Sequence, residues 1–136
     1  MSKGNTTEND VLLKLFNATE LSWDANTDLY VALHTGDPGE AGNQQSSECA
    51  FGSYARVTVA RSGAGWTVSG NTATNAATIS FPECTSGSET VTHVSIGTAS
   101  SGTGQVLYKG ALSASRSVSS GITLQFAAGA LDITED

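Results

Sequence analysis

The sequence predicts an all-β fold: an antiparallel, jelly-roll-like β-sandwich that carries one short N-terminal helix. From position 29 onward, roughly eight short segments with alternating apolar and polar residues recur at a spacing of roughly 8–12 residues, a pattern typical of sandwiches and barrels. Turns of small residues separate them, and no helix-length segment lies between them, which argues against parallel βαβ architecture. We therefore expect one domain, with residues 1–28 as an N-terminal arm and residues 29–136 as the sandwich.

Residues 5–21 carry the helix signal. Positions 5–7 offer capping oxygens, and the acidic residues that follow suit the positive end of a helix. The apolar stripe at helical spacing consists of Val11, Leu12, Leu15 and Phe16. A short stripe of this kind ordinarily packs on the protein's own sheet, which is the interpretation we favour. The alternative is an arm that docks on a neighbouring subunit.

From residue 29 onward the sequence indicates only strands and turns. They are expected at 29–34, 54–61, 66–68, 77–81, 90–97, 105–112, 115–118, 122–127 and 130–134. A long turn region, 35–47, separates the first two strands and contains Asp37, Pro38 and Gly39, a sequence that favours a turn. A loop of this length without structure of its own is often functional.

Composition and charge exclude several classes of function. Charged residues make up 14% of the chain, well below the roughly 25% of an average soluble domain, so much of the polar surface is neutral and suited to contact with other proteins. The net charge is −7, and residues 1–50 hold eight acidic and two basic residues. An acidic surface repels phosphate, so we expect neither a nucleic-acid partner nor an anionic membrane surface. With no apolar run near 20 residues and no signal-peptide core, we expect synthesis in the cytoplasm.

No arrangement of residues indicates catalysis. His34 and His93 lack metal-binding spacing, and Cys49 and Cys84 form no CxxC motif. No GxSxG elbow and no glycine-rich phosphate loop is present. We therefore expect no enzyme, no metal and no cofactor. Synthesis in the cytoplasm favours two free, non-functional thiols. The chain's larger aromatic residues suggest either a ligand platform or core bulk, and we favour the core: Trp23, Trp66, Phe81 and Phe126.

Six stretches of the sequence stand out as a set: Leu29–Gly42, Ser53–Val59, Asn75–Pro82, Thr92–Thr98, Gly110–Leu112 and Phe126–Ile133. Together, in this order, they resemble a family of small virion proteins of tailed bacteriophages. The resemblance spans residues 27–134, and its most specific part is LHTGDPGEAG followed by the GxYAR pattern that ends at Arg56.

The resemblance implies a structural virion component that is present in many copies and has no catalytic residues. Our first expectation is a capsid cement or decoration protein on the capsid exterior, which binds the major capsid protein and bridges capsomers. A tail-fibre or other tail component is the alternative, and a carbohydrate-binding sandwich is a weaker third. We also expect self-association as a trimer, since threefold positions occur between capsomers.

We expect two elements to make the partner contacts, the turn after the first strand and the N-terminal helix. In the turn, Pro38 restricts the backbone, and Asp37 and Glu40 offer carboxylates to cationic side chains. In the helix, the apolar stripe offers a packing surface. The expected contact residues are Val11, Leu12, Leu15, Phe16, Asp37, Pro38 and Glu40.

Overall fold

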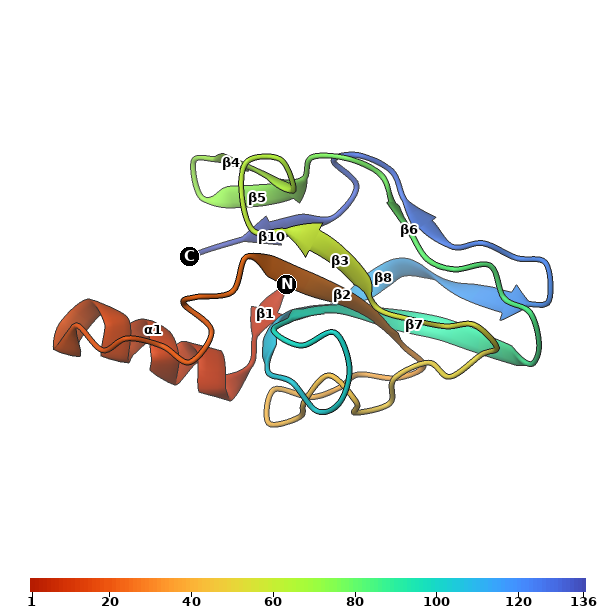
Figure 1. Cartoon of the computed structure of the whole chain (residues 1–136), viewed down its shortest axis with the longest axis horizontal. Helices are drawn as coiled ribbons and strands as arrows, with labels where there is room; N and C mark the ends of the chain where they lie inside the picture. Colours follow the sequence, from red (N-terminus) through yellow and green to blue (C-terminus); the bar gives the residue numbers. More distant parts are fainter.

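The computed structural model describes all 136 residues. The chain folds into two layers of antiparallel strands with one helix that projects from one end (Figure 1). This confirms the predicted all-β, sandwich-like class with a single short helix. The helix α1 (Asn5–Asn17) is one turn shorter than expected, because Ala18 adopts the left-handed conformation (φ 52°) and ends it.

One layer is a five-stranded sheet in the order β1-β8-β7-β2-β3. Its strands in that order are β1 (Ser2–Lys3), β8 (Val106–Ser119), β7 (Ser88–Gly97), β2 (Asp28–His34) and β3 (Val57–Ala60). Every pairing in it is antiparallel. The central strands β2 and β7 match the expected segments closely, because β2 is a short apolar run and β7 combines β-branched residues with the alternation of a strand.

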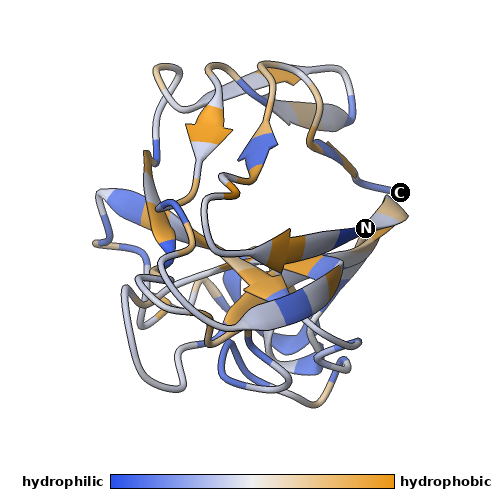
Figure 2. Cartoon of the chain, turned by 90° about the vertical axis from the view of Figure 1, so that its right-hand side faces the viewer, coloured by the Kyte–Doolittle hydropathy of each residue, from blue (hydrophilic) through white to orange (hydrophobic).

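The opposite layer consists of two small sheets, which Figure 2 shows above the larger sheet. The first has the order β10-β5-β4 and the second pairs β6 with β9. Their bounds are β10 (Asp132–Thr134), β5 (Thr72–Asn75), β4 (Trp66–Ser69), β6 (Ile79–Ser80) and β9 (Gln125–Phe126). Lys3, near the N-terminus, pairs with Glu135, near the C-terminus, so the two ends of the chain meet across the layers.

Strand β5 was missing from the expected strands. It forms a hairpin with β4 through the two-residue loop Gly70-Asn71, in which Gly70 has a φ of 60°. A glycine with positive φ at the first loop position is what a type II′ hairpin turn requires. The Gly-Asn pair was therefore a usable signal, but β5 itself has no large apolar residue.

Strand β8 is one strand, where two were expected on either side of residues 113–114. Its pairing with β7 shifts register at that point, since Val91 lies opposite Arg116 while His93 lies opposite Ala111. Leu112–Ser115 therefore lie opposite the single residue Thr92 as a large bulge. The expected break corresponds to an irregularity within one strand.

The core lies between the two layers. Its buried apolar cluster has 15 members, among them Leu33 and Val94 from the large sheet and Ile79, Phe81 and Leu131 from the opposite side. Aromatic rings connect the sides, since Tyr54 stacks on Phe81 with centroids 6.4 Å apart. Of the four aromatic residues expected in the core, Trp66 and Phe81 are buried in it, Phe126 is half-buried against it, and Trp23 is half-buried outside the core cluster.

His34, at the end of β2, is a fully buried polar residue of this core. Its Nδ1 lies 2.8 Å from the Ser46 carbonyl oxygen and its Nε2 lies 2.8 Å from the Ser95 hydroxyl. A carbonyl can only accept, so Nδ1 carries the proton and Nε2 accepts from Ser95. Burial lowers the pKa of His34, so the folded protein holds it neutral.

This burial predicts a specific dependence of stability on pH. Below about pH 6.5 the unfolded chain binds a proton at His34 that the folded chain does not, so the free energy of unfolding should fall as the pH drops through 6.5. Because one proton is involved, the contribution of His34 to the slope is at most ~1.4 kcal/mol per pH unit. Urea unfolding between pH 8 and pH 5.5 measures it, above the range in which Asp24, Asp37 and Glu135 titrate. A His34→Gln variant should flatten the dependence, and a flat wild-type profile would contradict this reading of the site.

Candidate interaction surfaces

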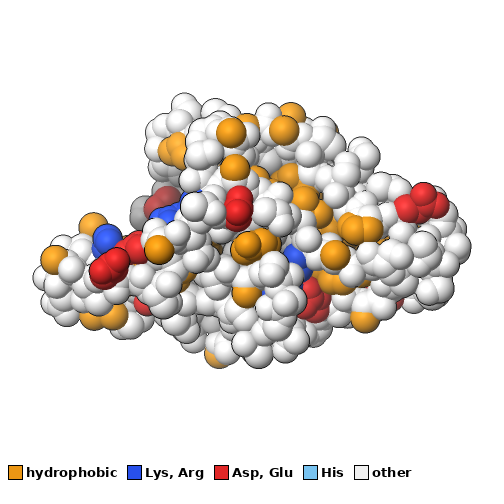
Figure 3. Space-filling view, in the orientation of Figure 1, with side chains coloured by type: hydrophobic (Ala, Val, Ile, Leu, Met, Phe, Trp, Pro, Cys, Tyr) orange, Lys and Arg blue, Asp and Glu red, His pale blue; other side chains and the backbone are white.

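The apolar stripe of α1 faces away from the body of the protein, contrary to the packing that we favoured. The side chains of Leu12, Leu15 and Phe16 are exposed by 56%, 71% and 79%. Figure 3 shows apolar side chains along the projecting part that α1 forms in Figure 1. We call these three residues the apolar ridge. Val11 is only partly exposed and lies at the edge of this ridge, between it and the face that carries Thr7 and Asp10.

The helix is attached through its polar face instead. Thr7 donates to the Val106 carbonyl (2.8 Å), and Asp10 accepts from the Gln105 amide (2.8 Å) and the Trp23 indole (2.9 Å). Lys14 pairs with Asp24 at 2.7 Å. At 100° per residue, Thr7, Asp10 and Lys14 share one face and the apolar ridge occupies the opposite one. Hydrogen bonds therefore fix which face of α1 meets solvent.

The turn after β2 is fixed to the body of the protein rather than free. Asp37 lies 3.0 Å from the amine of Lys109 and accepts from the Gly39 amide (2.9 Å), and these two contacts lower the pKa of its carboxyl group. Pro38 is buried, so it is unavailable to a partner. Glu40 keeps an exposed side chain, while its carbonyl accepts from the Asn5 amide (2.8 Å) at the start of α1.

The expected contact residues therefore do not form one surface. The turn meets the first turn of α1, whereas the apolar ridge lies toward the far end of the helix. Ten residues of helix separate Asn5 from Leu15, which is about 15 Å. The apolar ridge and the Asp37–Glu40 turn would have to contact a partner at separate places.

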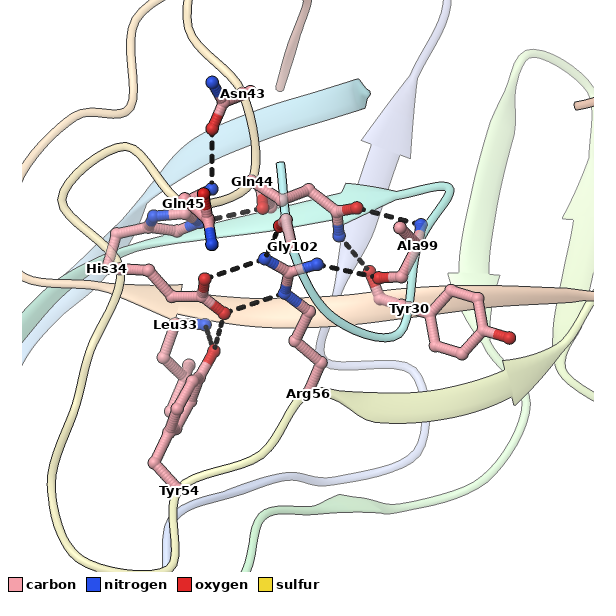
Figure 4. A network of polar contacts seen from close by, with 12 residues as sticks. Tyr30, Leu33, His34, Asn43, Gln44, Gln45, Tyr54, Arg56, Ala99 and Gly102 are labelled. Carbon is pink, nitrogen blue, oxygen red and sulfur yellow. Dashed lines mark hydrogen bonds and ion pairs between the residues drawn. The ribbon is translucent and has the colours of Figure 1, made fainter. Parts of the chain in front are cut away.

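A buried ion pair holds the long turn and a second loop against the sheet. Arg56 donates to both carboxylate oxygens of Glu48, at 2.7 and 2.8 Å, and its side chain is only 3% exposed. The same guanidinium donates to the carbonyls of Ala99 (2.9 Å) and Gly102 (2.6 Å) in the loop after β7 (Figure 4). Tyr54 adds a hydrogen bond to Glu48 (2.9 Å). The YAR sequence (residues 54–56) thus connects the long turn to the loop after β7 inside the protein.

Gln44 fixes the same region from the side of the turn. Its side chain is fully buried, and its Oε1 accepts from the Ala99 amide (2.9 Å) while its Nε2 donates to the Tyr30 carbonyl (3.4 Å) (Figure 4). The space exists because Gly97 has no side chain, since a Cβ there would lie 2.1 Å from the Gln44 Cδ. The turn is therefore a rigid part of the fold.

Asn75 plays the corresponding role in the opposite layer. It is 1% exposed, donates to the carbonyls of Ala77 (2.8 Å) and Ala127 (2.9 Å), and accepts from the Leu131 amide (2.9 Å). These bonds hold the turn between β9 and β10. Every polar atom of this buried side chain has a partner, as burial requires.

An apolar groove of about 530 Å³ lies beside the base of α1. We call it the tryptophan groove; its lining includes Trp23, Arg61, Trp66, Val68, Leu107 and Ile133. The guanidinium of Arg61 lies 5.2 Å from the Trp23 ring centroid and donates to the Asp24 carbonyl (2.8 Å), which fixes one wall. Val68 is 72% exposed, and the indole N–H of Trp66 has no hydrogen-bond partner. We expected both tryptophans in the core; Trp66 is buried there and also lines the groove, whereas Trp23 lies outside the core cluster.

A larger, open cleft of about 940 Å³ is bounded by the bulge of β8. Its lining mixes apolar residues with charges of both signs, including Lys109, Arg116 and Asp132. Lys109 is already paired with Asp37. The tryptophan groove is accordingly the better surface for an apolar partner.

The thiols and histidines do not gather into a reactive site. Cys49 and Cys84 are free and buried, and burial together with Glu89 raises the pKa of the Cys49 thiol to about 12. No group of three or more His, Cys, Asp or Glu side chains is placed to hold a metal ion. None of the helices has the length and apolar character to span a membrane.

The Arg56–Glu48 pair generates a stability prediction. Replacing Arg56 with Met leaves the Glu48 carboxylate largely buried without its counter-charge, so the free energy of unfolding should fall by about 3 kcal/mol or more. Lys14→Met is the matched control, because it removes an ion pair whose lysine is exposed and should change stability little. Urea denaturation of both variants measures the difference, and equal effects would contradict the structural role of Arg56.

A second prediction concerns the fit of Gln44 against Gly97. Gly97→Ala should destabilise the fold by about 2 kcal/mol, as overpacking of a well-packed site does. The cost should largely disappear in a Gln44→Ala background, because the clash is then absent. Gly63→Ala, where an added Cβ meets nothing within 4 Å, serves as control. A cost at Gly97 that is independent of residue 44 would refute this account.

Comparison with known proteins identifies the family. A family model described as Podophage GP4 fiber I protein gp80 matches residues 2–134, which includes α1 as well as both layers. No curated protein matches the chain. The match supports a structural component of a phage virion, and it favours the tail-fibre alternative over the capsid-decoration role that we placed first. Because it covers nearly the whole chain, the protein belongs to the podophage GP4 fiber I protein gp80 family.

Proposed function

We propose that the chain is a non-enzymatic component of a phage tail fibre that is held in the particle by protein–protein contacts. The fibre description of the matched family carries this proposal, since the match extends over residues 2–134. On this proposal the partners of the chain are tail proteins, in place of the major capsid protein that a decoration role would require.

The shape and rigidity of the molecule support an attachment role. The long turn after β2 and the loop after β7 are pinned by Arg56, Glu48 and Gln44, so little conformational entropy of these two segments remains to be lost on binding. The apolar ridge on the projecting helix offers three large apolar side chains to another protein. A rigid body with a projecting apolar arm suits assembly.

The chemistry of the nucleophile candidates agrees with a non-enzymatic role. His34 is fully buried and both ring nitrogens are engaged, which leaves no nitrogen free to act as a base. The raised pKa of Cys49 keeps that thiol protonated and unreactive near neutral pH.

The location of the chain in particles tests the proposal. Cys49 and Cys84 are buried, so a Ser101→Cys variant presents one reactive thiol on an exposed loop for maleimide-coupled gold. Particles assembled with this variant should carry gold at the tail in electron micrographs, whereas particles with the unsubstituted chain should stay unlabelled. Gold spread over the capsid shell would overturn the tail assignment and support a decoration protein.

A further inference from the structure

The apolar ridge and the tryptophan groove are two apolar surfaces for which the single chain supplies no cover. Leu15 and Phe16 are exposed by 71% and 79% on one of them, and Val68 is exposed by 72% on the other. An exposed Leu is ordinary, but a row of three on a helix and an apolar groove beside it are not scattered single residues. The apolar ridge offers side chains, and the tryptophan groove offers an apolar space that can receive them.

The tryptophan groove is preformed to accept apolar side chains. The Arg61 guanidinium, already bonded to the carbonyls of Trp23, Asp24 and Asn26, holds the wall that contains Trp23. A groove of about 530 Å³ lies within the size range of preformed binding sites. Because the walls are fixed beforehand, binding there orders little else.

The charges of the two surfaces are also complementary. Arg61 is the one charged residue in the lining of the groove. The apolar ridge occupies the C-terminal part of α1, where the free carbonyl groups give the helix end a partial negative charge. Lys14, in the last turn of α1, is paired with Asp24, so its charge is offset and the helix end keeps the sign that Arg61 favours.

Both surfaces lie at the same end of the molecule. Trp23, which lines the groove, donates a hydrogen bond to Asp10 of α1, and Figure 1 shows α1 and the β4–β5 hairpin at one end. In a closed ring each copy gives one surface to one neighbour and a different surface to the other, so a knob and a hole on different faces of the chain satisfy every copy. A row of three side chains is small against the roughly 1,200 Å² of a stable interface, and closure makes the contact more than once.

We infer that the apolar ridge of one copy seats in the tryptophan groove of a second copy, so that the chain forms a closed homo-oligomer. This deepens the proposed function by naming a partner, a second copy of the chain itself. Because it is tested on purified protein, its failure is distinguishable from a failure of the tail assignment.

The chain provides its own reporter of groove occupancy. Trp23 and Trp66 are the only two tryptophans, and both line the groove, so all tryptophan emission arises there. Analytical ultracentrifugation of the wild-type protein across a dilution series should show an oligomer that dissociates. The emission maximum should shift to longer wavelength over the same range. A monomer at every concentration, or dissociation without a change in emission, would overturn the inference.

Three variants separate this interface from others. Leu15→Ser with Phe16→Ser removes the ridge, and Val68→Lys obstructs the groove; all three positions are exposed, so the fold should survive. Each variant should weaken self-association about 30-fold or more, as loss of an interface hot spot does. Ile122→Ser, an exposed apolar residue outside both surfaces, is the matched control and should associate like wild type. Wild-type association by the ridge or the groove variant would refute the interface.

Mixing the ridge variant with the groove variant gives the most specific test. The ridge variant keeps an intact groove and the groove variant keeps an intact ridge, so a mixture can form contacts that neither variant forms alone. Sedimentation of the mixture should reveal mixed oligomers, with a shift of emission to shorter wavelength from the intact groove. No recovery on mixing would overturn the pairing of ridge with groove.

Discussion

The buried ion pair between Arg56 and Glu48 is the constraint on which the arrangement of the loops depends. Arg56 directs four hydrogen bonds to two segments far apart in sequence, the end of the long turn at Glu48 and the loop that contains Ala99 and Gly102. An apolar pair of similar volume would fill the same space, often at no loss of stability. It would not, however, specify where the carbonyls of Ala99 and Gly102 lie. The ion pair therefore fixes the position of the two loops. Removing either residue leaves the charge of the other buried without a counter-charge.

The segments that resemble a virion family contact one another through buried polar side chains of this kind. Glu48 and Gln44 of the long turn contact Arg56 of the YAR sequence and the loop after Gly97, and Asn75 of the NAATISFP stretch holds the FAAGALDI stretch through Ala127 and Leu131. These side chains point inward, where their partners leave few substitutes. Because they are engaged inside the fold, the same residues say little about what the molecule binds.

Features set by neighbouring residues could be predicted from the sequence, whereas features set by contacts between distant residues could not. The apolar run of β2 and the alternation in β7 are local, so those strands could be predicted, and the break expected at residues 113–114 located the bulge in β8. The burial of Pro38 and the outward turn of the apolar stripe could not be predicted. Which face of α1 meets the body is decided by Gln105 and Trp23, which lie 95 and 13 positions from the Asp10 carboxylate that they contact. The pattern of a helix indicates two faces, but only distant partners decide which one is buried.

The orientation of α1 is a near balance that specific hydrogen bonds resolve. Turning the helix over to bury Leu12, Leu15 and Phe16 would gain about 2 kcal/mol for each side chain. The same rotation would leave Thr7, Asp10 and the Gln105 amide without partners, at about 1–3 kcal/mol for each group that stays buried. Because these amounts are similar, apolar burial alone does not choose the face. The three polar groups have partners only at the geometry observed, whereas apolar side chains are satisfied by any apolar surface. The polar face is therefore committed to the chain's own fold, and the apolar face is the one that another molecule can cover.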